Sequence, residues 1–79
     1  MYYITAKVKD EDNKYLQCYL AYNKEDNTNY WSTWNIRLYY IEEIANLIVS
    51  QMSACNYYYD SKLGEDIDID SIKVVEFKE

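Results

Sequence analysis

The stretch that decides the fold is residues 2–22, YYITAKVKDEDNKYLQCYLAY, in which two alternating runs flank a polar centre. In the first run every second side chain is apolar and would share one face of a strand: Tyr2, Ile4, Ala6 and Val8. In the second run the same holds for Leu16, Cys18, Leu20 and Tyr22. Alternation with a period of two is typical of a half-buried strand. Residues 10–13 are polar and turn-prone, so the sequence predicts an antiparallel hairpin with a loop of about four or five residues.

Outward from this hairpin, the polar stretch 23–29 predicts a surface loop. Residues 30–34 (YWSTW) predict a short third strand or an extended segment, and we expect Trp31 and Trp34 to pack in the core or against a helix. The period then changes, and apolar residues recur at helical spacing: Ile41, Ile44, Ala45, Ile48, Met52 and Cys55. This pattern predicts an amphipathic helix of about four turns, with Asn35 as a candidate N-cap.

The carboxyl-terminal third contains an acidic stretch and then a β-branched one. Residues 60–70 are acidic and predict a loop, whereas residues 71–77 (SIKVVEF) predict a strand that pairs beside the first one. One helix must cover one face of the sheet. The sequence therefore predicts a single α+β domain over residues 1–79. It is a small two-layer domain, a three- to four-stranded antiparallel sheet with one amphipathic helix on one face, in the order β-β-(β)-α-β.

Composition limits the chemistry. The chain of 79 residues has 14 acidic and 8 basic side chains, a net charge of -6 and no histidine, which is the commonest general base. Cys18 and Cys55 are the only thiols, too few for a zinc site, and both fall on predicted apolar faces, where a free thiol packs well. We therefore expect a protein that is not an enzyme and that needs no metal or cofactor.

Charge and hydropathy also limit the surroundings. No segment approaches the roughly 18 apolar residues that cross a bilayer. The amino terminus lacks the basic and apolar regions of a signal peptide. We therefore expect no membrane contact and a cytoplasmic location. Because the chain and nucleic acid carry the same sign of charge, direct nucleic-acid binding is not expected.

Carboxylates collect in two segments that are candidate partner-binding sites. The hairpin tip carries Asp10, Glu11 and Asp12, and the late acidic stretch carries Asp60, Glu65, Asp66, Asp68 and Asp70. We expect Glu25 and Asp26 of the following loop to lie on the same side of the domain. Such a surface attracts a basic protein and can imitate a phosphate backbone, which is DNA mimicry. Ordinary solubility is the alternative, since a net charge of this size is normal for a small domain.

A calcium loop is excluded by residue spacing within the late acidic stretch. Asp66, Asp68 and Asp70 match the opening of such a loop. However, Ser71 stands where the loop requires glycine, and Phe77 where it requires glutamate.

Tyrosine is over-used, with 11 copies, and some of these side chains leave the predicted core. Tyr3, Tyr15 and Tyr19 fall on the strand face opposite the apolar positions. They could stabilise the sheet through cross-strand ring pairs. They could also anchor a protein partner, because tyrosine is enriched at interface hot spots. Both alternatives stay open at the level of the sequence.

Four short segments resemble small proteins of phages and mobile elements: Tyr2-Tyr3-Ile4, Trp31-Ser32, Glu42-Glu43-Ile44-Ala45 and Ile72-Lys73-Val74-Val75. That class includes acidic inhibitors of host defence, notably anti-CRISPR proteins. The resemblance implies a phage-encoded, non-enzymatic inhibitor that binds a basic, nucleic-acid-handling nuclease complex in the host cytoplasm. An accessory or structural phage protein that self-associates, for example as a homodimer, is the alternative.

Overall fold

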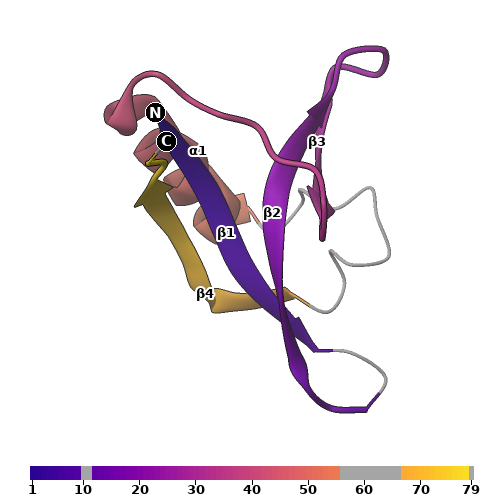
Figure 1. Cartoon of the computed structure of the whole chain (residues 1–79). Helices are drawn as coiled ribbons and strands as arrows, with labels where there is room; N and C mark the ends of the chain where they lie inside the picture. Colours follow the sequence, from indigo (N-terminus) through magenta and orange to yellow (C-terminus); the bar gives the residue numbers. More distant parts are fainter. Residues whose placement is uncertain (10–11, 56–66, 79) are drawn as a thin grey trace.

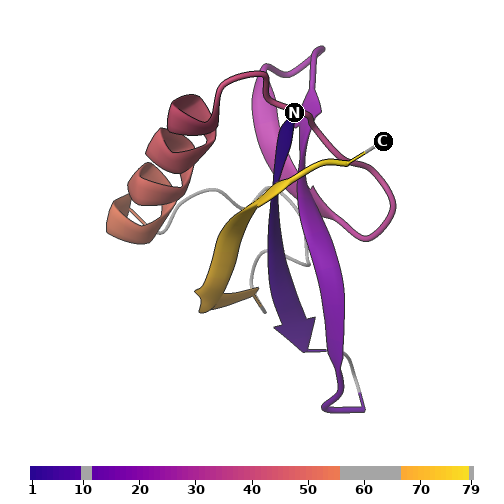
Figure 2. The same ribbon diagram turned by 60° about the vertical axis from the view of Figure 1, so that its left-hand side comes forward.

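A computed structural model of the chain describes residues 1–9, 12–55 and 67–78 (Figure 1). The described elements are β1 (Tyr2–Lys9), β2 (Tyr15–Asn23), β3 (Thr28–Ser32), α1 (Glu42–Cys55) and β4 (Ile67–Glu76). The strands form one antiparallel sheet in the order β3-β2-β1-β4, and α1 packs on one face against β1 and β4 (Figure 2). The predicted α+β fold is confirmed, as is the pairing of the last strand with the first.

The alternation in residues 2–22 produces the predicted hairpin. β1 and β2 pair from Thr5–Tyr19 to Lys9–Tyr15, so residues 10–14 connect them. Within that connection, Asn13 has a φ angle of 62°, a left-handed conformation that asparagine tolerates better than most residues do. The turn therefore closes without a glycine.

A second hairpin, between β2 and β3, corrects the prediction of a surface loop over residues 23–29. Asn23 pairs with Thr28, so only residues 24–27 make the turn. The Asn23 side chain holds that turn: its Oδ1 accepts a hydrogen bond from the Glu25 N–H at 3.0 Å, and its Nδ2 donates to Asp26 at 3.1 Å. The polar stretch thus encodes a tight turn and the start of an edge strand, rather than an extended loop.

The core lies on the sheet face that α1 covers. Its buried members are Ile4, Ala6, Val8, Cys18, Leu20, Trp31, Tyr39 and Ala45. Leu16 was predicted for this face but is exposed, because β3 pairs only with residues 19–23 of β2 and does not extend along the Leu16 end of that strand. Tyr2 and Tyr22, also predicted for this face, are half-buried.

The two tryptophans differ in burial. Trp31 pairs with Leu20 and is 1% exposed, as the prediction of a core residue requires. Trp34 lies beyond the end of β3 and is 83% exposed, so its predicted packing is wrong. The alternation in residues 30–34 does not predict the position of Trp34, because the chain leaves the sheet after Ser32 and the period of two no longer applies. The Ser32 hydroxyl accepts hydrogen bonds from the N–H groups of Trp34, at 3.2 Å, and Asn35, at 3.0 Å.

Residues 33–41, here called the crossover segment, carry the chain from β3 past β2 to α1 (Figure 1). The Arg37 N–H donates to the Leu20 carbonyl at 3.1 Å, and Tyr39 and Tyr2 exchange two backbone hydrogen bonds of 2.8 Å each. The segment therefore pairs with β2 on one side and β1 on the other, beyond the point where their own ladder ends. The Arg37 guanidinium stacks over Tyr22 at 4.3 Å and over Tyr39 at 5.0 Å, an attraction between a cation and a ring face.

The helix begins at Glu42, later than a cap at Asn35 would place it. Asn35 instead donates from Nδ2 to the Tyr30 hydroxyl at 2.6 Å. Ala45 is fully buried against the sheet, but Ile41 and Ile44, predicted for the same buried face, are exposed. The helix meets the sheet through Ala45, Ile48 and Val49, so its contact is rotated away from the predicted stripe. The side chains of Met52 and Cys55 lie outside the described part.

Because Trp31 is buried and Trp34 is exposed, replacing each of them should change the stability of the fold by a different amount. Trp31→Ala removes a buried ring and should lower the free energy of unfolding by about 3–5 kcal/mol. Trp34→Ala removes an exposed ring and should change it by less than about 0.5 kcal/mol. Urea unfolding measures both, and the remaining tryptophan of Trp34→Ala should fluoresce as a buried indole. A large loss of stability in Trp34→Ala would contradict the described position of that side chain.

Candidate functional site

The face of the sheet opposite α1, here called the open face, collects several of the predicted residues. Cross-strand partners share a face, so the pairs Thr5–Tyr19, Lys7–Gln17 and Lys9–Tyr15 all project from it. Tyr3 lies two residues before Thr5 on the same face and pairs with Val75 of β4. The structure therefore places Tyr3, Tyr15 and Tyr19 on one face, as the alternation predicted.

Two of these tyrosines form an aromatic cluster with a residue that the predicted tyrosine set omitted. The rings of Tyr3 and Tyr19 lie 5.8 Å apart, and the ring of Phe77 lies 6.4 Å from that of Tyr3. Thr5, next to them on the open face, is buried, and its hydroxyl donates to the Cys18 carbonyl at 2.7 Å. The cluster therefore stabilises the sheet as well as facing outward. The signal for Phe77 was present in the sequence, since it alternates in phase with Val75.

Tyr15 stands apart from that cluster. It lies toward the hairpin tip, separated from Tyr19 along β2 by Gln17, and it is 57% exposed. Its described ring contact is with the Lys9 ammonium, 5.9 Å from the ring centre. The Gln17 amide between the two tyrosines donates to the Thr5 hydroxyl at 3.1 Å. Of the predicted tyrosines, Tyr15 therefore offers the most ring surface to a partner.

Asp68 and Asp70 lie in β4, which corrects the prediction of a loop over residues 60–70 for its last four residues. Thr5 pairs with Lys73 but Lys7 pairs with Asp68, so Ile69 to Ile72 bulge out opposite Ala6 alone. Bulges of this kind bend a strand and re-aim its side chains. Ile67 and Asp68 stay in the ladder opposite Val8 and Lys7, whereas Asp70 lies in the bulge.

Inside this bulge, the side chains of Ser71 and Asp68 form hydrogen bonds with backbone groups. The Ser71 hydroxyl accepts from the Lys7 N–H at 2.8 Å and donates to the Asp68 carbonyl at 2.6 Å. The Asp68 carboxylate accepts from the Asp70 N–H at 3.1 Å. These bonds hold the backbone of the bulge at Asp70.

A groove of about 460 Å³ opens on this part of the sheet. Tyr15, Gln17 and Asp70 line it, together with Lys7 and Lys73. The size lies in the range of small ligand sites, but the groove is partly open to solvent. It brings together one residue from the predicted tyrosine set and one from the predicted acidic set, which two separate sequence arguments had singled out.

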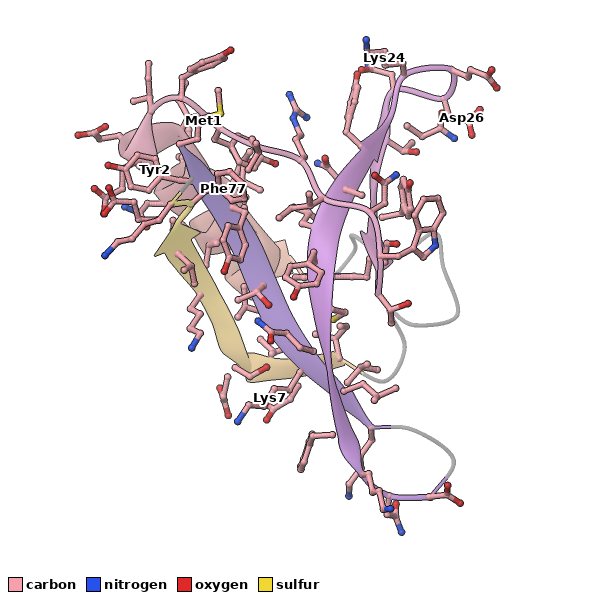
Figure 3. The ribbon with its side chains drawn as sticks, viewed as in Figure 1. Met1, Tyr2, Lys7, Lys24, Asp26 and Phe77 are labelled. Carbon is pink, nitrogen blue, oxygen red and sulfur yellow. The ribbon has the colours of Figure 1, made fainter. Side chains whose placement is uncertain are left out.

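The predicted acidic residues divide into three groups. Asp12 lies exposed at the hairpin tip, at the same end of the sheet as Asp68 and Asp70 of β4, and these three form the first group. Glu25 and Asp26 occupy the β2–β3 turn at the opposite end, where Figure 3 shows Asp26, so the expectation of a single acidic side including them is wrong. The remaining predicted carboxylates lie outside the described residues: Asp10, Glu11, Asp60, Glu65 and Asp66.

Lysines share the acidic end of the sheet. Lys7 and Lys9 project from β1 on the open face, and Lys14 precedes β2 near the tip. The described carboxylates there, Asp12, Asp68 and Asp70, are therefore interspersed with cations. A mixed pattern of this kind selects a partner of complementary pattern rather than generating a long-range negative field.

The described thiol is not placed for catalysis. Cys18 is fully buried, and its Sγ donates to the Ala6 carbonyl at 3.4 Å. Burial raises the pKa of Cys18 from 9.0 to about 11, so the reactive thiolate form is scarce near neutral pH.

Comparison of the chain with known protein families, with curated proteins and with solved structures found no match. Within the described part of the chain, α1 is too short and too polar to cross a membrane as a helix.

The buried thiol makes stability depend on pH. The pKa of Cys18 is higher in the folded chain than in the unfolded one. The contribution of the protonated thiol to the free energy of unfolding is therefore fully present below about pH 9 and falls as the pH rises toward 11. The loss between pH 7 and pH 10 should be about 1 kcal/mol. Cys18→Ala keeps a small apolar side chain without an ionisable thiol and should lose less stability over that interval. Urea unfolding of both proteins at the two pH values measures the difference, and equal losses would contradict the assignment.

Proposed function

We propose that this protein is a non-enzymatic inhibitor that binds a bacterial nucleic-acid-handling defence nuclease, as anti-CRISPR proteins do, and that it is phage-encoded. The observation that supports it most is the groove on the open face, which exposed Tyr15 lines from β2 and Asp70 from β4. A groove that holds both a tyrosine ring and a carboxylate suits an arginine or lysine side chain, which stacks on a ring and pairs with the charge. Such side chains line the nucleic-acid channels of nucleases.

The mode of binding follows from the mixed charge of this end. Lys7 and Lys73 line the same groove, so a partner's cation would be directed toward the Asp70 side of it. Tyr15 would supply the desolvated anchor, and Tyr3 and Tyr19 an aromatic surface beside it. Occupying the channel in this way would exclude nucleic acid from it, and the inhibitor itself would not bind nucleic acid.

The proposal predicts that two charges on the bulge matter more than two charges elsewhere. Asp68→Asn with Asp70→Asn keeps the size of both side chains and an oxygen that can accept the Asp70 N–H bond. This double variant should bind the nuclease roughly tenfold more weakly. Glu25→Gln with Asp26→Asn removes the same charge from the opposite end of the sheet and should bind as the unaltered protein does.

The measurement is capture of proteins from a bacterial lysate on the immobilised chain and its two variants, followed by nuclease assays with the captured enzyme. A basic nuclease should be retained by the unaltered and the Glu25/Asp26 proteins and should be displaced by added nucleic acid. If the bulge variant retains and inhibits the nuclease equally well, the proposed contact is wrong.

Self-association is the second candidate function, and β3 and β4 favour it, because both are edge strands of the sheet. An unpaired edge is a template for pairing with a second chain. Sedimentation over a concentration series separates the two candidates. A monomer at every concentration would remove the self-associating alternative, whereas a stable dimer without any captured nuclease would favour it.

A further inference from the structure

Exposed apolar side chains lie on the outer side of α1 and on the two residues just before it. Tyr40 is 81% exposed, Ile41 51%, Ile44 47% and Leu47 58%. Ile44 and Leu47 are three residues apart and adjoin one another on the helix, and Tyr40 and Ile41 immediately precede its first residue, Glu42. We call these four side chains the α1 stripe. Single exposed apolar residues are ordinary, but a contiguous set on one element marks an interaction surface.

The stripe exists because α1 has more apolar surface than the sheet can cover. Ala45 is buried, and Ile48 and Val49 are half-buried, so these three make the contact with the sheet. Ile44 and Leu47 lie on the flank of that contact and reach solvent. The apolar arc of α1 is therefore wider than the roughly 100° stripe that a surface helix needs for one contact.

Glutamates lie at the amino-terminal end of α1 and on the adjoining end of β4. Glu42 and Glu43 form the first turn of α1, and the helix sequence from 42 to 55 contains no lysine or arginine. Glu76 of β4 pairs with Tyr2, and Tyr2 pairs on its other side with Tyr39, just ahead of the helix (Figure 3 labels Tyr2). The pKa of Tyr2 is raised by Glu42, then by burial, and then by Glu76 and Glu43, in accord with this convergence.

We propose that the α1 stripe docks a basic amphipathic segment of another protein. Its apolar side chains would cover Ile44 and Leu47, and its lysines or arginines would pair with Glu43 and Glu42. The occupant follows from charge, since Glu43 adjoins Leu47 at helical spacing, Glu42 stands in the same first turn, and the sequence of α1 contains no lysine or arginine. A second copy that docked through its own α1 fits poorly, because that helix would add further glutamates and no lysine or arginine to the contact.

This surface is independent of the proposed function. α1 covers the core face of the sheet (Figure 2), whereas the groove is lined by the open-face residues Lys7, Tyr15 and Gln17. Variants of one surface can therefore be scored without disturbing the other.

The probe is a pair of synthetic helical peptides with the same length and leucine pattern, one with lysine and one with glutamate at its polar positions. Fluorescence anisotropy of the labelled peptides should show that the lysine peptide binds at least tenfold more tightly at low salt. Added salt should reduce that ratio, because the pairs are exposed.

Two matched pairs of variants locate the contact. Ile44→Ser with Leu47→Ser should weaken the lysine peptide at least tenfold, whereas Trp34→Ser, which removes an exposed apolar side chain elsewhere, should not. Glu42→Gln with Glu43→Gln should weaken it similarly. Glu25→Gln with Asp26→Asn removes the same charge from the β2–β3 turn and should leave binding unchanged.

Circular dichroism checks that each variant folds, and Leu47→Ser alone replaces the double variant if that one does not. The proposal is overturned if the lysine peptide fails to bind, if the glutamate peptide binds equally well, or if either control weakens binding as much as its partner. Sedimentation that shows a dimer abolished by Leu47→Ser would assign the stripe to a second copy and would also overturn it.

Discussion

The arrangement of this small domain depends on the backbone of the crossover segment, which fills the space between β1 and β2. Their mutual ladder ends at Thr5–Tyr19, and beyond it the Arg37 N–H bonds to Leu20 while Tyr39 pairs with Tyr2. Buried backbone groups must find partners. The segment supplies them to both strands at once, and the Arg37 guanidinium packs on the rings of Tyr22 and Tyr39 at the same place.

This pairing also decides where the helix lies. Because α1 begins three residues after Tyr39, and Tyr39 is tied to the first residue of β1, the helix descends along β1 and β4 rather than β2 and β3. Ala45 then meets the sheet closely, and the wider apolar flank of the helix is left outside. The domain thus presents two unlike surfaces, a polar and aromatic groove on one face and an apolar, acid-bordered helix on the other.

The parts of the fold that follow from local periodicity were predictable from the sequence. Residues 2–22 specified a hairpin, and the alternation placed Tyr3, Tyr15 and Tyr19 together on the face away from the helix. Phe77 could have been added to them by the same reasoning. Trp34 could not be placed in this way, because its exposure depends on Ser32 ending the strand.

Features that depend on contacts between distant parts of the chain could not be predicted from the sequence. The burial of Ala45 rather than Ile44 depends on the angle at which the crossover segment delivers the helix, which no local pattern contains. The bulge that brings Asp70 to the groove depends on a hydrogen bond from Lys7 to Ser71, 64 positions apart in the chain. The opposed positions of Asp26 and the hairpin tip follow from the second hairpin, which the polar composition of residues 23–29 concealed.

That bulge has an evolutionary consequence. The Ser71 hydroxyl bonds to the Lys7 N–H and to the Asp68 carbonyl in place of regular ladder hydrogen bonds. The register of residues 73–76 against β1 is therefore separate from that of residues 67 and 68. Changes at Ile69 and Asp70 therefore need not propagate into the part of β4 that supports α1. The fold contains a position where groove chemistry can diversify between variants of the protein while the scaffold stays constant, as a hypervariable loop does on a conserved framework.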